Sequence, residues 1–272
     1  MSYFTICKYD NDLYQIKDAL GSLISVIIGK DKALVLDTGY GLANIYEEVR
    51  KITDLPLLVI DSHGHMDHTG GNYLFNEVYI HSFDYELAKK HNSLAWRKKN
   101  IASAINMNVL PADFDEEEYL KQREGNLKFL DDIKYFDLGG KTLEVINTPG
   151  HTKGSISLYC KEKKIMITSD AICQYVWLFL EESTSVSDYI SSVEKVLLYD
   201  FDYFLVGHGP RLIEKDVMKE YLECAKSLDL SKAKKVTFKN FEECDSYEYS
   251  TDYLYSPKGC GVVFDINKIK ND

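Results

Sequence analysis

The chain has 272 residues, 45% hydrophobic and 28% charged, a composition that excludes extended disorder and is sufficient for a large core. Its 43 acidic residues outnumber the 32 Lys and Arg residues, and the net charge of −11 argues against nucleic acid and anionic membranes as partners. Residues 1–10 contain no secretory signal, and the apolar stretch 171–180 is too short to cross a bilayer. We therefore expect a cytoplasmic protein.

The N-terminal part of the sequence reads as a run of strands. Strands are predicted at Leu23–Ile28 and Ala33–Leu36, joined by a polar turn, and residues 39–52 show helical spacing. Further predicted elements are strands at residues 57–60, 78–81, 134–136, 143–146, 165–167, 203–206 and 261–264, and an amphipathic helix at 187–198.

The sequence contains no linker rich in Pro, Gly or Ser between these elements. We therefore predict a single domain over residues 1–272. Two segments extend its core: a polar, helix-rich insertion at about 83–132, and a Tyr-rich C-terminal β extension at about 232–272.

A dense cluster of metal-binding residue types follows the apolar strand 57–60. His63, His65, Asp67 and His68 lie within six residues, and imidazole and carboxylate groups suit zinc, iron or manganese. In an extended segment His63 and His65 point the same way, whereas Asp67 and His68, at a turn, aim at a second position. The spacing therefore permits two metal ions close together.

Three further candidate ligands also follow predicted strands. His151 comes after the strand 143–146, Asp170 after 165–167 and His208 after 203–206. A rigid sheet presents such strand-end residues along one edge. For the other two histidines we expect structural roles, with His81 packed or capping at a strand end and His91 solvated on a helix.

These residues resemble the motifs of the metallo-β-lactamase superfamily, in its glyoxalase II-like, binuclear hydrolase branch. The resemblance rests on HxHxDH at 63–68, TPGHT at 148–152, the acid Asp170 and GHG at 207–209, in family order over about residues 20–210. It implies an α/β (α+β) fold in which two mixed β-sheets, flanked by helices, form a four-layer αββα sandwich with the site at one edge.

The resemblance also implies a complete set of metal ligands. His63, His65 and His151 would bind the first metal, and Asp67, His68 and His208 the second, with Asp170 bridging both. The cofactors would be two divalent ions, zinc as the first choice, with iron or manganese as alternatives. Asp37, in an Asp-Thr-Gly turn after a strand, is placed as in the family to steady an imidazole, although a plain turn would explain it equally well.

The reaction implied is hydrolysis without a covalent enzyme intermediate. A hydroxide bridging the two metals would attack the carbonyl carbon of a small-molecule thioester, ester or lactone. We assign catalytic roles to Asp67, which would orient the nucleophile, and to the bridging Asp170.

Several other activities occur in the same superfamily. Lactam hydrolysis is disfavoured because Asp170 stands where the best-known β-lactamases carry cysteine, and a lactonase is not favoured because Cys173 occupies the position of its tyrosine. Phosphodiesterase or nuclease activity is disfavoured by the acidic composition, and an iron-dependent oxidoreductase by the full ligand set.

The residues that select the substrate are the least readable part of the sequence. We assign a substrate lid to aromatic and apolar side chains of the insertion and of the stretch 171–180, although packing between helices would explain them equally well. The lid candidates are Trp96, Met107, Tyr119, Tyr175 and Trp177. Oligomeric state is left open.

Overall fold

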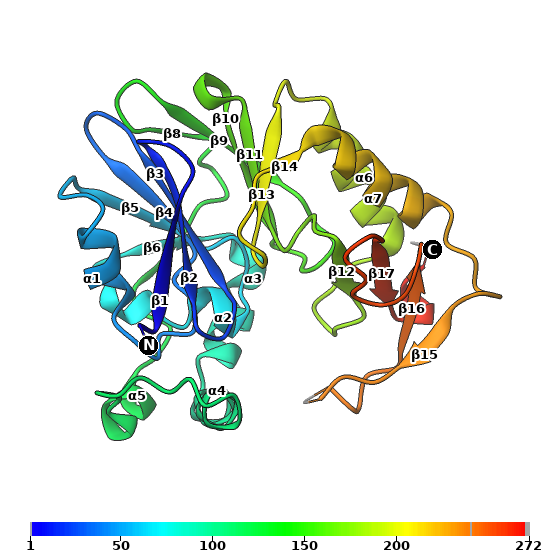
Figure 1. Cartoon of the computed structure of the whole chain (residues 1–272), viewed down its shortest axis with the longest axis horizontal. Helices are drawn as coiled ribbons and strands as arrows, with labels where there is room; N and C mark the ends of the chain where they lie inside the picture. The colour runs from blue at the N-terminus through cyan, green and yellow to red at the C-terminus, as the bar shows by residue number, and fades with distance from the viewer. Residues whose placement is uncertain (1, 240, 270–272) are drawn as a thin grey trace. The chain divides into compact units, whose positions relative to one another are not determined.

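The computed structural model describes residues 2–239 and 241–269 and divides into two compact units. The first comprises Met1–Val145 with Gly207–Arg211, and the second Ile146–Val206 with Leu212–Asp272. Figure 1 labels the elements along the chain. The single domain over 1–272 stays a prediction.

The first unit is built on a seven-stranded mixed sheet in the order β1-β2-β3-β4-β5-β6-β7. Strands β1 to β4 pair antiparallel, and β4 to β7 pair parallel. The strands are β1 (Phe4–Lys8), β2 (Leu13–Asp18), β3 (Leu23–Ile28), β4 (Ala33–Leu36), β5 (Leu57–Ile60), β6 (Val78–Ile80) and β7 (Leu127–Phe129). The predicted strands at 23–28, 33–36 and 57–60 are confirmed, whereas β7 was not predicted.

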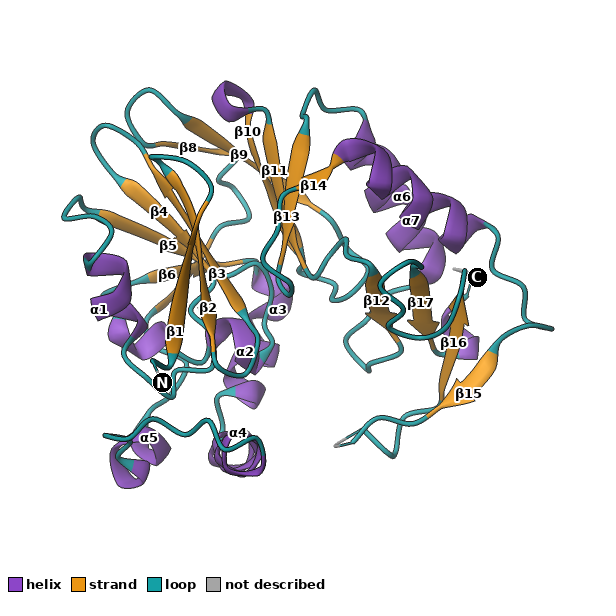
Figure 2. Cartoon of the chain, in the orientation of Figure 1, coloured by secondary structure: helices purple, strands orange, loops and turns teal. Residues whose placement is uncertain are grey.

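Along the chain, the helices of the first unit connect its consecutive parallel strands (Figure 2). They are α1 (Ile45–Arg50), α2 (Met66–Thr69), the 3-10 turn η1 (Asn72–Leu74), α3 (Ser82–His91), α4 (Leu94–Asn106) and α5 (Glu116–Lys121). Helix α1 is shorter than the predicted 39–52 because Gly39 and Gly41 adopt positive φ, which ends the regular spacing before Asn44 caps the helix. Ile45 and Val49 of α1 pack on sheet residues such as Val35.

A hairpin completes the first unit. Strands β8 (Tyr135–Asp137) and β9 (Thr142–Asn147) pair antiparallel, and β9 continues into the second unit. Both agree with the strands expected at 134–136 and 143–146.

The second unit contains a mixed sheet and a smaller sheet. Its larger sheet has the strand order β14-β13-β11-β10, and the smaller has the order β12-β17-β16-β15. The strands are β10 (Ile156–Cys160), β11 (Ile165–Ser169), β12 (Tyr175–Leu178), β13 (Tyr203–Val206), β14 (Ile213–Glu214), β15 (Lys234–Val236), β16 (Ser246–Ser250) and β17 (Gly261–Phe264). The expected C-terminal extension therefore contains strands, and the unpredicted β12 joins them.

Two amphipathic helices, α6 (Val186–Leu197) and α7 (Lys215–Lys226), lie side by side in the second unit (Figure 2). The predicted helix at 187–198 is confirmed as α6, which starts at a capping box between Ser185 and Asp188. Buried residues of both helices, including Val193 and Leu222, pack in one core with the strands. Short 3-10 turns η2 (Lys161–Lys163) and η3 (Ile266–Lys268) complete the elements.

Within the described residues, none of the helices is both long enough and apolar enough to span a membrane.

Candidate metal centre

The loop after β5 brings two of the predicted histidines together. Nε2 of His63 lies 3.1 Å from Nδ1 of His65, and both side chains are buried. Main-chain N–H groups and the hydroxyl of Thr69 at the end of α2 donate to the carbonyl of His65, which fixes the turn that follows. His63 and His65 thus present ring nitrogens to a common point, as their alternation predicted.

A second group forms around one carboxylate oxygen. Oδ2 of Asp67 lies 3.3 Å from Nε2 of His68 and 3.4 Å from Nε2 of His208. His208 reaches this position because Leu23 N–H donates to the Gly207 carbonyl at 2.9 Å, beside a β-bridge between Ser22 and His208. Burial would raise the pKa of Asp67, but His68 and His208, when protonated, outweigh burial by their charge and hydrogen bonds and hold that pKa well below its usual range.

Asp37 orients two of these imidazoles. Its Oδ2 accepts from Nδ1 of His68 at 2.9 Å and from the Ser62 hydroxyl at 2.9 Å. Because the Ser62 hydroxyl donates its proton to Asp37, the Ser62 oxygen can accept a hydrogen bond from Nδ1 of His63, which lies 2.9 Å away. When neutral, both rings keep their proton on Nδ1 in this arrangement and offer the lone pair of Nε2, the state that a metal ligand needs.

A turn not singled out in the sequence holds His208. The Gly21 carbonyl accepts from Nδ1 of His208 at 3.2 Å. Oδ1 of the buried Asp18 accepts from the N–H groups of Leu20, Gly21 and Ser22 at 2.8–3.0 Å. Burial raises the pKa of Asp18 to about 6, although these hydrogen bonds oppose the shift. An Asp three residues before a Gly, as in many tight turns, was the available sequence signal.

The loop after β4 and the loop that follows α2 approach each other closely, and Gly70 makes this approach possible. A Cβ on Gly70, which follows α2, would lie 2.4 Å from the Tyr40 carbonyl. This approach brings the loop after β4 against the loop that carries His68, where Thr38 N–H donates to the His68 carbonyl at 2.7 Å.

The second unit contains the other two predicted ligands. Nε2 of His151 lies 4.0 Å from Oδ2 of Asp170. Nδ1 of His151 donates to the Trp177 carbonyl at 2.8 Å, so its Nε2 also keeps a lone pair. Asp170 follows β11 at the left-handed Ser169, whose φ of 46° redirects the chain at the strand end.

The donor groups around Asp67 in the first unit suit a divalent cation. Around a tetrahedral ion with bonds of about 2.1 Å, neighbouring ligand atoms lie about 3.4 Å apart. The separations of the Asp67 oxygen from the nitrogens of His68 and His208 match that spacing. Imidazole nitrogen and carboxylate oxygen are also the ligand types that zinc, iron and manganese accept.

The structure corrects the expectation for His91. It is buried on α3, its ring stacked on His65 with centroids 5.0 Å apart and on Trp96 with centroids 4.1 Å apart. Its Nδ1 accepts from Met66 N–H at 3.3 Å. The prediction was wrong because it rested on the polar residues next to His91 in the sequence, whereas the ring packs on His65, 26 positions earlier. His81 caps α3 by accepting from Phe83 N–H, as expected.

The lid candidates differ in their environments. Tyr119 is 3% exposed and packs with Leu42 and Ile101, its hydroxyl donating to the Tyr40 carbonyl at 3.0 Å, whereas Met107 is 55% exposed. Tyr175 and Trp177 lie on β12 and are half-buried. Their roles toward a substrate stay predictions.

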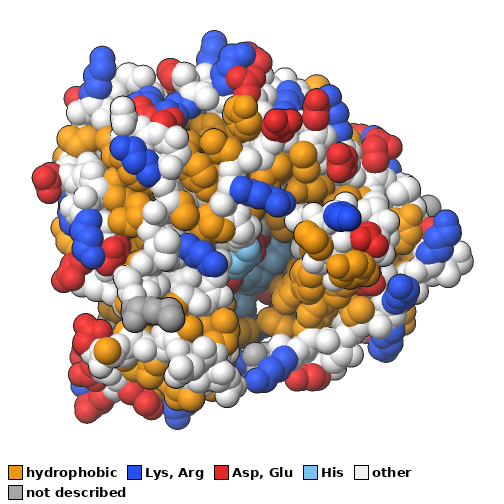
Figure 3. Space-filling view, viewed as in Figure 1, with side chains coloured by type: hydrophobic (Ala, Val, Ile, Leu, Met, Phe, Trp, Pro, Cys, Tyr) orange, Lys and Arg blue, Asp and Glu red, His pale blue; other side chains and the backbone are white. Residues whose placement is uncertain are grey.

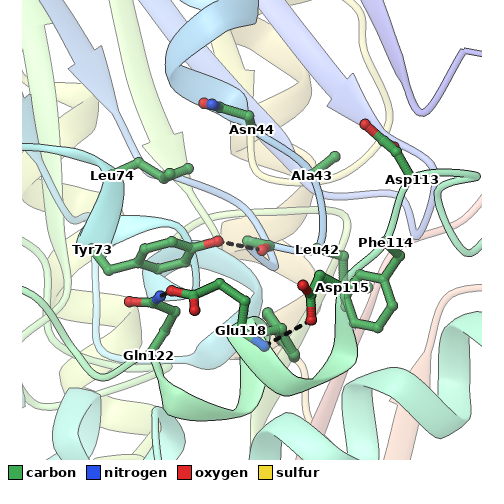
Figure 4. A pocket seen from close by; sticks show the side chains of 12 residues that line it. Leu42, Ala43, Asn44, Tyr73, Leu74, Asp113, Phe114, Asp115, Glu118 and Gln122 are labelled. Carbon is green, nitrogen blue, oxygen red and sulfur yellow. Dashed lines mark hydrogen bonds between the residues drawn. The ribbon is translucent and has the colours of Figure 1, made fainter.

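A cavity of about 390 Å³ opens elsewhere in the first unit, between the segment 41–44 and α5 (Figure 4). Tyr73, Phe114 and Glu118 are among its lining residues, whereas the predicted metal ligands are not. The Tyr73 hydroxyl donates to the Gly41 carbonyl at one side of it.

Comparisons with known proteins agree with this geometry. The family model described as "Metallo-beta-lactamase superfamily" matches residues 18–208. Acyl-coenzyme A thioesterase MBLAC2 of Bos taurus is 27% identical over 189 residues, 64% of this chain and 66% of that protein, just under two thirds of its length. The probable metallo-hydrolase YqgX of Bacillus subtilis is 27% identical over 71% of this chain and 86% of its own.

Solved structures agree on the fold. A metallo-beta-lactamase from Pontibacter korlensis superposes with a TM-score of 0.56 at 17% identity, over 83% of this chain and all of that one. This likeness confirms the predicted fold class, in which mixed sheets are flanked by helices.

Proposed function

The chain belongs to the metallo-β-lactamase superfamily, and from this premise we propose that it is a binuclear metal-dependent hydrolase that cleaves a small-molecule thioester. Ester and lactone hydrolysis are the neighbouring possibilities. The thioester is favoured because the similar Bos taurus protein is named an acyl-coenzyme A thioesterase. Thiols also have pKa values near 8.5, so a thiolate leaves with little need for proton transfer.

The proposed ligands fall into two sets joined by one bridge. His63, His65 and His151 would hold one ion, and Asp67, His68 and His208 the other. Asp170 would bridge them, and zinc is the metal proposed. The convergence of two Nε2 atoms on one Asp67 oxygen is the observation that carries this proposal.

When bound, the divalent ions would lower the pKa of a water molecule toward neutrality and polarise the substrate carbonyl. The chain supplies the ligand orientation. Asp37 holds His68 directly and His63 through Ser62, and the carbonyls of residues 21 and 177 hold His208 and His151. The carboxylate of Asp67 is ionised at neutral pH, as carboxylates ordinarily are, and can accept a hydrogen bond from the attacking water.

Hydrolysis by the metal-loaded protein tests the proposal. The substrates are acyl-coenzyme A thioesters, lactones, aryl esters, phosphodiesters and a chromogenic cephalosporin. We expect thioester cleavage, a loss of at least 100-fold in kcat in Asp170→Ala, and unchanged activity in Asp132→Ala, which removes an exposed acid. Hydrolysis confined to phosphodiesters or the cephalosporin would contradict the thioester assignment.

A further inference from the structure

Aromatic side chains cluster on the small sheet of the second unit and the loops beside it. The ring centroids of Trp177 and Phe238 are 4.7 Å apart, and those of Trp177 and Phe241 are 5.8 Å apart. Tyr255 extends the cluster, with its ring 5.3 Å from that of Tyr175 and its hydroxyl accepting from the Trp177 indole at 3.0 Å. We call these five residues, Tyr175, Trp177, Phe238, Phe241 and Tyr255, the aromatic surface.

Strand β12 connects this surface to a proposed metal ligand. Its side chains alternate, so Val176 and Leu178 are buried while Tyr175 and Trp177 are half-buried on the opposite face. The main-chain carbonyl of Trp177 accepts from Nδ1 of His151 at 2.8 Å. The aromatic surface therefore begins at the residue that orients His151.

Trp177, Phe238 and Phe241 are half-buried and pack on the buried Phe179 and Val263, whereas Tyr255 is largely open to solvent. Tyr255 is 53% exposed and adopts a φ of 61°, a left-handed conformation that is unfavourable for a bulky side chain. Strain of this kind persists where the surrounding structure holds it and is frequent at binding sites. Here it places an aromatic ring against Trp177 with half of its surface in contact with solvent.

The charges around the surface do not favour a ligand of either sign. Exposed acids such as Glu242 and Asp252 and exposed lysines such as Lys239 and Lys258 stand on the loops that carry it. An uncharged hydrocarbon chain is not repelled, and its binding over the rings is favourable because it removes apolar surface from water. Hydrophobic side chains gather over the small sheet in Figure 3.

We infer that the aromatic surface binds the apolar acyl chain of the substrate, extending away from the carbonyl group at the metal centre. This inference rests on the proposed thioesterase function and assigns the residues that select chain length. Burial of one methylene group corresponds to about a fourfold gain in binding. The surface should therefore raise kcat/KM about fourfold per methylene until the chain outgrows it.

Acyl-coenzyme A substrates from two to sixteen carbons test this selection. In the metal-loaded protein we expect kcat/KM to rise steeply with chain length. In Tyr255→Ser or Phe238→Ser the rise should be smaller, so that kcat/KM for the twelve-carbon substrate is at least tenfold below the wild-type value. The control is Tyr203→Ser, which removes a ring that is 43% exposed at the start of β13. It should retain the wild-type dependence.

A binding measurement separates the inference from the reaction. Trp96 and Trp177 are the two tryptophans of the chain, so in Trp96→Phe the remaining emission reports on the aromatic surface. We expect 1-dodecanol, an uncharged twelve-carbon chain, to shift this emission to shorter wavelength in a saturable manner, and Tyr255→Ser to weaken the affinity at least fivefold. This readout needs no turnover.

The outcomes are distinct. Dodecanol binding without hydrolysis of any thioester would leave the aromatic surface as the chain-binding site and refute the proposed reaction. Thioester hydrolysis that ignores chain length, with no shift in Trp177 emission, would overturn the inference and retain the reaction. A change of oligomeric state in Phe238→Ser, measured by sedimentation, with unchanged chain-length dependence, would assign the surface to contacts between copies and also overturn it.

Discussion

The carboxylate of Asp37 and the imidazole of His68 are joined by a 2.9 Å hydrogen bond between two buried side chains. Asp37 also accepts from the Ser62 N–H at 2.7 Å, and through the Ser62 hydroxyl it reaches His63. Its own backbone lies in the left-handed region, with a φ of 70°. One acid on the loop after β4 thus sets the ring orientation of two proposed ligands from the loop after β5.

Asp37→Asn is expected to weaken metal binding. An amide offers one acceptor oxygen where the carboxylate receives three hydrogen bonds, so His68 and Ser62 cannot both keep theirs. Loss of such an outer partner typically costs 10- to 100-fold in metal affinity, measurable by competition with a chromogenic chelator. Ser62→Ala, which disturbs His63 but leaves the bond to His68, should lose less. Equal affinities in the three proteins would contradict the orienting role.

Metal loading is expected to stabilise the fold and to depend on His208. A ligand that binds only the folded state at 100 times its Kd adds about 2.7 kcal/mol to the free energy of unfolding. Wild-type protein should therefore unfold at a higher temperature with zinc than with a chelator, and elemental analysis should find about two equivalents. His208→Ala should bind about one equivalent fewer, while His81→Ala serves as the matched control outside the ligand set. Full metal content in His208→Ala would remove that residue from the centre.

The sequence predicted most of the sheet and the candidate ligands because both depend on local pattern. Continuous apolar runs such as Leu57–Ile60 identify buried strands, and the polar residues that follow must lie at strand ends. The structure brings His63, His65, Asp67, His68 and His208 close together within the first unit. His208, about 140 positions from the others, was found because a Gly-His-Gly turn follows its strand.

What the sequence could not supply are contacts made by the backbone or across long separations. The acceptors of His208 and His151 are the main-chain carbonyls of Gly21 and Trp177, groups that every residue carries. His91 is buried by stacking on His65, which no periodicity on its own helix reveals. Strand β12 was missed because its apolar run continues into the neighbouring loop residues, so no pattern marked its ends.

Asp18 should make stability depend on pH. Its pKa is about 6 in the folded protein and 3.8 ordinarily, so between these values the folded state binds more protons than the unfolded state. The free energy of unfolding should therefore fall as pH rises from 4 to 7, by about 3 kcal/mol from this residue. Asp18→Asn keeps an oxygen for the N–H groups of residues 20–22 and removes the titration. Urea unfolding of both metal-free proteins measures the difference, and parallel pH profiles would contradict the assignment.

Arg97 on α4 should be the residue on which the helical insertion depends most for stability. It is fully buried, its Nη2 donates to the Asn92 side chain at 2.8 Å and to the Gly70 carbonyl at 3.3 Å, and its guanidinium lies 4.7 Å from the Tyr119 ring centroid. Arg97→Ala leaves these acceptors buried and opens a cavity, so the free energy of unfolding should drop by about 3–5 kcal/mol in urea titrations. Arg123→Ala is the matched control, because that side chain is exposed and bonds carbonyls of its own turn, and its effect should stay within about 0.5 kcal/mol. A cost for Arg97→Ala as small as that of the control would show that the insertion is held by its apolar contacts instead.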